Sequence, residues 1–319
     1  MDDALPAGFE VRRARPDDAA AVAALVAASQ EAFQGQAEIS SASVLRKWRA
    51  PHFDLERDAW LVQTDDGRVI AFGAVRETGP GGEFEGNFTV HPAYYGHGIA
   101  AYILGRLEER VCTAVAARGQ GAAVLQTWTG SDNPAERDLL RRSGYRQIAV
   151  FSRMEKDLRD ELEDPVWPSG VGPRPFRPGR DDLAVYTVLV EAFGEDDENL
   201  GDPEEWSRDV VDDPRADPDL WLLACAGEEV VGVAIDSLSG ERGFIERLAV
   251  RPAWQGRGIG GALLREAFAL LRRRGATRAV LAVELDVAVE ALDLYRRAGM
   301  TEARRIEFYE KRIAPAMDV

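Results

Sequence analysis

The same series of segments occurs twice along this 319-residue chain. The Gly-rich segment "RPAWQGRGIGGALL" at Arg251–Leu264 has a less regular copy, "HPAYYGHGIAAYIL", at His91–Leu104. Three further pairs of segments follow the same order: 11–26 with 173–190, 60–75 with 221–235, and 139–156 with 294–311. Such self-similarity indicates a duplication. The sequence therefore predicts two similar domains in tandem.

The expected boundary is the Pro- and acid-rich stretch "DLRDELEDPVWPSGVGPRP". Its composition argues against continuous helix or strand. We expect an N-terminal domain over 1–157, a linker over 158–175 and a C-terminal domain over 176–319. Each half shows an opening strand, a capped helix, a hairpin, a strand ending in the Gly-rich turn, a long helix, a strand, a helix and a last strand. This order predicts α/β (α+β) domains, each a mixed, mostly antiparallel sheet flanked by helices.

The charge and the cysteines limit the possible functions. The formal net charge of -16 disfavours partners such as nucleic acid and anionic membrane surfaces. Cys112 and Cys225 lie in apolar runs, and the chain has only three histidines, so we expect free thiols and no metal site. The first residues show no basic region followed by an apolar core. The expected compartment is the cytoplasm.

The Gly-rich turn predicts an anion site. Amides in the first turn of a helix have no intrahelical partner, and the helix dipole favours negative charge there. Glycines at Gly256, Gly258 and Gly260 let a phosphate approach the backbone, and Arg257 can add a positive charge. A pyrophosphate fits this arrangement.

A dinucleotide site is an open alternative. Gly256, Gly258 and Gly261 satisfy GxGxxG, and Glu284 lies at the distance expected of a ribose-binding acid. However, "RPAWQ" separates the first glycine from its strand, and the preceding segments are predicted to form an antiparallel hairpin. A Walker A loop is excluded, because the turn lacks GK[ST].

Nearly the whole chain resembles the GCN5-related N-acetyltransferases, once in each half. The hallmark [RQ]-x-x-G-x-[GA] is matched in full by Gln255–Gly260, and by Tyr95–Ala100 except at its first position. The later Asn, Leu-Tyr and Gly-Phe signature is similar to "ALDLYRRAGM" and "NPAERDLLRRSGY". The duplicated layout resembles tandem acetyltransferases of actinobacteria such as mycothiol synthase. The resemblance implies acetyl-CoA as co-substrate, bound in the C-terminal domain by Leu248, Ala249, Val250, Gln255, Gly256, Arg257, Gly258, Ile259, Gly260 and Gly261.

The resemblance also implies a mechanism. An amine attacks the thioester directly, the amide near Leu248 stabilises the oxyanion, and a tyrosine protonates the leaving thiolate. Tyr295 occupies the position of this acid, where the first half has Leu140. We take Glu246 as the general base because it shares a strand face with Leu248, with Glu284 and Asp236 as alternatives.

The first half is expected to be degenerate. Gly86 stands at the position corresponding to Glu246. The family's Asn is present as Asn133 in the first half but is Ala288 in the second. A second acyl-CoA site is possible at Val90, Gly96, His97, Gly98 and Ala100, or the glycines remain only for the geometry of the turn.

The predicted function is transfer of an acetyl group to a primary amine of a cationic small molecule. The carboxylates of Glu191–Trp206, between the first two helices of the second half, suit a cation, although such a run is often only a solvated loop. Alternatives are mycothiol-synthase-like acetylation of an amino-sugar thiol conjugate and a non-catalytic acyl-CoA-binding module. We expect no nucleic-acid or membrane partner, and either a monomer or a homodimer.

Overall fold

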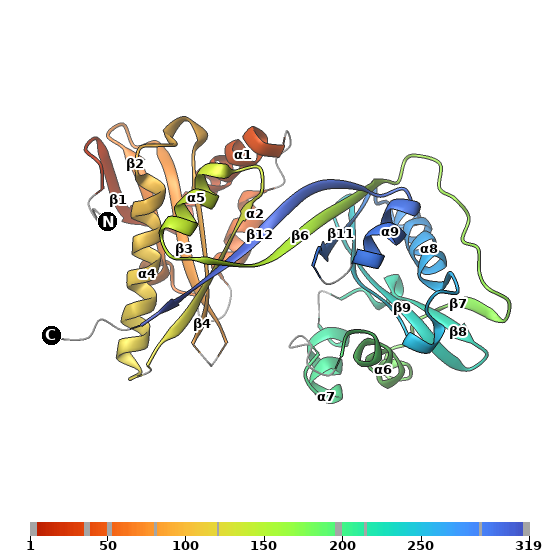
Figure 1. The fold of residues 1–319 in the computed structure, drawn as a ribbon. Helices are drawn as coiled ribbons and strands as arrows, with labels where there is room; N and C mark the ends of the chain where they lie inside the picture. Colours follow the sequence, from red (N-terminus) through yellow and green to blue (C-terminus); the bar gives the residue numbers. More distant parts are fainter. Residues whose placement is uncertain are drawn as a thin grey trace. The chain divides into compact units, whose positions relative to one another are not determined.

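The computed structural model describes residues 5–34, 39–49, 53–79, 82–119, 121–194, 200–213, 216–286 and 289–314. It divides into two compact units, shown in Figure 1. The first unit combines 1–150 with 304–319, and the second comprises 151–303. This division differs from the expected one at 157 and 176, because each unit takes its last strand from the other half of the sequence.

The first unit is a sheet with helices on both faces. Its strands lie in the order β1-β2-β3-β4-β5-β12. Among the strand pairs of its described residues, β4 and β5 are the parallel one, over Glu83–Glu85 with Val124–Gln126. The elements are β1 (Phe9–Arg13), α1 (Ala19–Gln34), α2 (Ser41–Trp48), α3 (Leu55–Asp58), β2 (Ala59–Thr64), β3 (Val69–Gly79), β4 (Glu83–Val90), α4 (Ile99–Ala117), β5 (Ala123–Gly130), α5 (Pro134–Arg142) and β12 (Thr301–Ile313).

The second unit repeats this plan with strand order β7-β8-β9-β10-β11-β6. Here β10 and β11 are the parallel pair, over Arg242–Phe244 with Arg278–Val280. The elements are β6 (Arg146–Asp157), β7 (Val171–Pro175), α6 (Asp182–Phe193), α7 (Pro203–Trp206), a π-helical turn (Ser207–Val211), β8 (Leu222–Ala226), β9 (Glu229–Ser239), β10 (Arg242–Val250), α8 (Ile259–Arg273), β11 (Arg278–Glu284) and α9 (Val289–Arg297).

The two last strands are exchanged between the halves. β6 follows α5 in the sequence, yet Phe151–Asp157 pair with β11 of the second unit. β12 follows α9, and Ile306–Ile313 pair with β5 of the first unit. The sequence correctly predicted a last strand in each half, but the order of segments did not reveal its partner.

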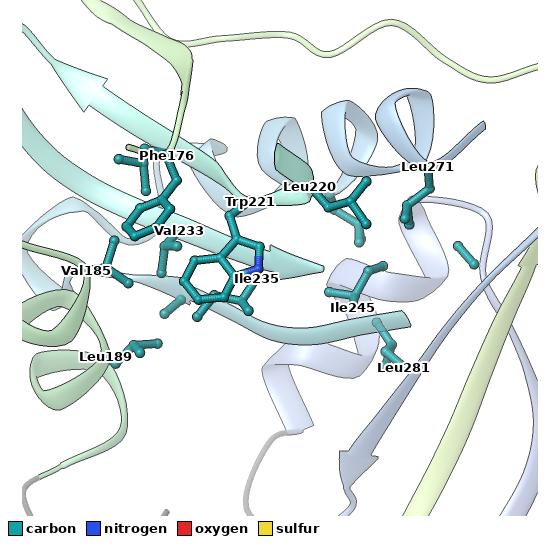
Figure 2. Packing of buried hydrophobic residues seen from close by; sticks show 14 of the residues in the cluster. Phe176, Val185, Leu189, Leu220, Trp221, Val233, Ile235, Ile245, Leu271 and Leu281 are labelled. Carbon is teal, nitrogen blue, oxygen red and sulfur yellow. The ribbon is translucent and has the colours of Figure 1, made fainter. Parts of the chain in front are cut away.

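Each unit buries apolar residues on both faces of its sheet. In the second unit, Val185 and Leu189 of α6 point toward Val233 and Ile235 of β9, as Figure 2 shows. Ala234 lies on the opposite face, in a cluster with Leu263 and Ala267 of α8. Alternate β9 residues therefore face α6 and α8, as the two-residue period of a strand requires. Trp167 of the expected linker also packs against the α8-side cluster.

Candidate acetyl-transfer site

A bulge and a fork define the site in the second unit. β10 pairs with β9 in regular register except at Glu246, which is the extra residue between Ile245 and Arg247. On its other side β10 pairs with β11 only as far as Phe244 and Val280. Beyond that point the two strands share no ladder, so β10 and β11 diverge. Leu248–Val250 lie on the diverging segment, where unpaired backbone groups can bind an extended ligand as an added strand.

The Gly-rich turn follows directly from this strand. Gly256 (φ 72) and Gly258 (φ 87) both adopt left-handed backbone conformations, and Gly258 is the N-cap of α8. A Cβ at either glycine would meet no atom within 4 Å, so the space above the turn is open. The first intrahelical bond is donated by Ala262 to the Gly258 carbonyl. The amides of residues 259–261 therefore face this open space without an intrahelical partner, which suits a pyrophosphate.

The side chains of the turn stabilise its shape. Gln255 Nε2 donates to the Val250 carbonyl oxygen at 3.0 Å, which ties the turn to the end of β10. Arg257 donates to the Ala253 carbonyl at 3.0 Å and lies over the Trp254 ring at 4.8 Å. The guanidinium is thus held beside the turn, and Ile259 anchors the helix start in the core with 1% exposure.

The three candidate bases have different surroundings. Glu246 is exposed on the α6 side of the sheet and accepts a hydrogen bond from Ser237 Oγ at 2.6 Å. The expectation that Glu246 shares a strand face with Leu248 was wrong, because the bulge breaks the alternation and Leu248 pairs with Ala234 on the α8 side. Glu284 is half-buried at the end of β11. Asp236, opposite Ile245, is only 1% exposed, and neither of its carboxyl oxygens has a hydrogen-bond partner. Burial, with a smaller contribution from Glu246, raises the pKa of Asp236 well above its ordinary value. A carboxyl that is sealed from solvent in this way is unsuited to accept a proton from an incoming amine.

Tyr295 is carried by α9, which packs on the start of α8. A Cβ at Gly260 would lie 3.4 Å from Leu294 Cδ2, so this glycine permits a close approach of the two helices. Tyr295, the next residue, packs half-buried against the main core. Burial raises its pKa, which keeps the phenol protonated near neutral pH. The helix next to the Gly-rich turn thus carries a protonated phenol.

The α6 face beside Glu246 is the candidate acceptor side. Phe193, at the end of α6, lies 5.4 Å from the Arg247 guanidinium on β10. Glu191, one of the predicted acidic residues, accepts from Arg251 at 2.6 Å, and Glu229 shares the same arginine. Residues 195–199 of the predicted acidic segment lie outside the described residues, as does Ala288.

The first unit retains the turn. Gly96 (φ 82) and Gly98 (φ 79) have the same left-handed conformations, and Gly98 is again the N-cap of a long helix, α4. However, a Cβ at Gly98 would lie 3.7 Å from Pro6, and the His97 ring lies 6.1 Å from Phe9. The N-terminal segment therefore lies beside the turn. Val90 is buried and Ala100 is half-buried in the helix.

The first unit lacks the bulge. β3 and β4 pair without interruption from Ala71 with Val90 to Val75 with Gly86. Counted along the ladders, Val75 is the counterpart of Asp236, and Glu246 is an inserted residue without a counterpart. The assignment of Gly86 to the position of Glu246 is therefore a correction: Gly86 corresponds to Ile245. Leu140, in place of Tyr295, is fully buried.

Two features of the site were not predicted from the sequence. One is the bulge, because a single strand does not reveal how it pairs with its neighbour. The other is the contribution of β6. Its residues Phe151–Met154 pair with Glu284–Leu281 of β11, the part of β11 that no longer pairs with β10. β11, one of the two diverging strands, is thus paired with a strand from the first half of the sequence.

Comparisons with known proteins found relatives over most of the chain. The model of the acetyltransferase (GNAT) family matches residues 22–145 and 183–300. A mycothiol acetyltransferase of Kineococcus radiotolerans is 31% identical over 294 residues, covering 89% of each chain. One from Streptomyces scabiei is 28% identical over 304 residues, covering 93% of this chain and 94% of that protein.

Solved structures show the same tandem fold. A GCN5-related N-acetyltransferase from Sphaerobacter thermophilus superposes with a TM-score of 0.86 at 32% identity, over 99% of both chains. A tandem GNAT protein from the clavulanic acid biosynthesis pathway gives a TM-score of 0.69 at 14% identity, which is a likeness of fold. Among the residues that the structure describes, no helix is long and apolar enough to cross a membrane.

Proposed function

Because the chain belongs to the acetyltransferase (GNAT) family, we propose that its second unit acetylates a primary amine and that its first unit is catalytically inactive. The observation that carries this proposal is the bulge at Glu246, which occurs in the β9–β10 ladder and not at the equivalent place in the β3–β4 ladder. Acetyl-CoA is the acetyl donor and supplies an activated thioester.

The proposed roles follow from the positions of the side chains. The amides of residues 259–261 hold the pyrophosphate, and the diverging strand Leu248–Val250 holds the pantetheine arm. Glu246, exposed on the α6 side and aligned by Ser237, accepts the amine proton. The amide near Leu248 donates to the thioester carbonyl oxygen. Tyr295 returns a proton to the leaving sulfur.

The acceptor is proposed to be a small amine. Its positive charge suits Glu246 and the half-buried Glu284 on the same face of the sheet. The relatives named for mycothiol acetylation make an amino-sugar thiol conjugate the second candidate acceptor.

The test uses two full-length variants and an amine library. Gly258→Glu places bulk and negative charge in the phosphate turn of the second unit, and Gly98→Glu does the same in the first. We expect release of CoA from acetyl-CoA to vanish in Gly258→Glu and to persist in Gly98→Glu, with both proteins folded by circular dichroism. Activity that survives Gly258→Glu and is lost in Gly98→Glu would contradict the assignment of the units.

A non-catalytic acyl-CoA-binding role makes a different prediction. The wild type would then bind CoA by calorimetry and lose this binding in Gly258→Glu, yet turn over no amine. Preference for a nicotinamide dinucleotide over CoA in the same titration would instead support the dinucleotide site.

A further inference from the structure

The linker segment 158–170 lies along α8, from the end of that helix toward its start. At the end of α8, Arg272 Nη1 donates to the Asp160 carbonyl oxygen at 3.5 Å. Near the start of α8, Trp167 packs against the cluster that contains Ile259 and Leu263, two residues of the first turns of the helix. The linker therefore extends to the part of α8 that carries the Gly-rich turn.

Arg265 lies between these two contacts and reaches back toward the turn. Its Nη1 donates to the Gly261 carbonyl oxygen at 3.2 Å, and a Cβ at Gly261 would lie 3.2 Å from the same nitrogen. Gly261 is the last of the three residues whose amides are proposed to hold the pyrophosphate. It lies three residues beyond the N-cap Gly258, hence about 4.5 Å farther along the helix axis. The guanidinium is thus beside the proposed pyrophosphate site and displaced from the turn along α8.

The linker supplies the carboxylate that holds this guanidinium. Glu163 Oε2 accepts from Arg265 Nε at 3.0 Å and from Arg265 Nη2 at 2.8 Å. The Glu163 side chain is 74% exposed, whereas that of Arg265 is 22% exposed. An ion pair with so exposed a carboxylate contributes little to stability, so another anion can displace Glu163. A phosphate is suited to this, because a guanidinium binds two phosphate oxygens at once.

The duplicated helix lacks this arginine. The two Gly-rich segments end at Leu264 and Leu104, and the next residue is Arg265 in α8 but Gly105 in α4. The turn and the long helix are present in both units, so neither requires a cation at this position. The arginine therefore distinguishes the unit that is proposed to be catalytic.

We propose that Arg265 binds the 3′-phosphate of acetyl-CoA and that Glu163 occupies the guanidinium when the donor is absent. This inference rests on the proposed function, in particular on the pyrophosphate lying at the turn. In CoA a ribose separates the 3′-phosphate from the pyrophosphate, and Arg265 is likewise displaced from the amides that hold the pyrophosphate. The second unit thus selects CoA thioesters over donors that lack this phosphate.

The test is calorimetry with CoA and with 3′-dephospho-CoA. The background is full-length Gly98→Glu, in which the turn of the first unit is blocked, so that the titration reports on the second unit. We expect CoA to bind roughly tenfold more tightly than 3′-dephospho-CoA, as one charged hydrogen-bonded contact predicts. Equal affinity for the two ligands would overturn the inference.

Two variants should change this affinity ratio in opposite directions. Arg265→Met keeps most of the apolar length of the side chain and removes its charge, so the ratio should fall to near one. Glu163→Gln removes the competing carboxylate and should raise the ratio. Loss of packing alone would not move the ratio in two directions. The control is Arg272→Met, which removes a positive charge about 10 Å farther along α8 and should leave the ratio unchanged.

The outcomes separate this inference from the proposed function. If Arg265→Met weakens CoA and 3′-dephospho-CoA equally, the arginine serves the pyrophosphate, and the inference is overturned while the proposed function stands. A ratio that Arg265→Met leaves unchanged has the same consequence. A protein that shows the expected ratios but acetylates no amine would refute the proposed catalysis and support the inference. A protein that binds neither ligand would refute both.

Discussion

Replacing Asp236 by valine should stabilise the second unit, and the gain should grow with pH. Asp236 is 1% exposed, and its two carboxyl oxygens have no hydrogen-bond partner. The counterpart at the same ladder position in the first unit is Val75, which is 2% exposed. The fold thus already accommodates valine at this position.

The magnitude has two parts. Removing an unsatisfied buried polar group is worth about 1–3 kcal/mol of unfolding free energy at any pH. The second part arises because burial raises the pKa of Asp236, so folded chains bind a proton that unfolded chains release above about pH 4. Wild-type stability is then fully present below the unfolded pKa. It falls by about 1.4 kcal/mol per pH unit as pH rises toward the folded pKa.

The assay is differential scanning calorimetry at several pH values from 4.5 to 8. In a unit of about 150 residues, 1.4 kcal/mol corresponds to roughly 3–6 °C in Tm. The difference in Tm between Asp236→Val and wild type should widen by that amount per pH unit until the folded pKa is reached. Asp236→Asn should remove the pH dependence while retaining an unsatisfied polar group. Val75→Asp should transfer the penalty to the first unit.

A Tm difference that is the same at pH 5 and pH 8 would refute this reasoning. It would mean that the Asp236 carboxyl is ionised in the folded chain, or that it has a partner there. A destabilised Asp236→Val would instead show that the carboxyl contributes a favourable interaction in the core.

Three further predictions concern the site and the fold. Tyr295→Phe should lower kcat by roughly 10²-fold with unchanged CoA affinity by calorimetry; wild-type turnover would assign protonation of the thiolate to another group or to solvent. Glu246→Gln should lower kcat/KM by about 10²-fold or more while Glu284→Gln retains activity, and the reverse ranking would exchange their roles. A fragment of residues 151–303, which includes the paired part of β6, should melt cooperatively in calorimetry, whereas the fragment 158–303 should not, because β11 would lack a partner beyond Val280; equal cooperativity would argue against the exchange of strands.

The local features of the site could be predicted from the sequence. The Gly-rich turn requires a left-handed backbone at Gly256 and Gly258, and glycine adopts that conformation without strain. The glycine motif in the sequence is therefore sufficient to locate the turn. The duplication likewise predicted two sheets of the same type. The surroundings of Asp236 could not be predicted in this way, because the strand "EVVGVAIDSLS" does not reveal which residues of β10 lie opposite. The bulge at Glu246 follows from pairing between strands and has no signature within either strand.

The exchange of β6 and β12 could not be predicted for a related reason. The two strands occupy equivalent ladder positions with similar residues: Met154 pairs with Leu281, and Tyr309 with Thr127. Both are buried within their sheets. Similar strands are compatible with either sheet, so apolar patterning predicts a strand without specifying its partner.

The exchanged strands have a consequence for synthesis on the ribosome. The first unit begins the chain, yet β5 ends at Gly130 and receives its outer partner only from residues 306–313. At about 5–20 residues per second, the roughly 175 intervening residues take about 9–35 s. During this time "AVLQTWTG", which carries no charged side chain, presents an open sheet edge to other nascent chains. The second unit is complete at residue 303. A ribosome that stalls just after this point would therefore release a finished second unit joined to an unfinished, aggregation-prone first unit.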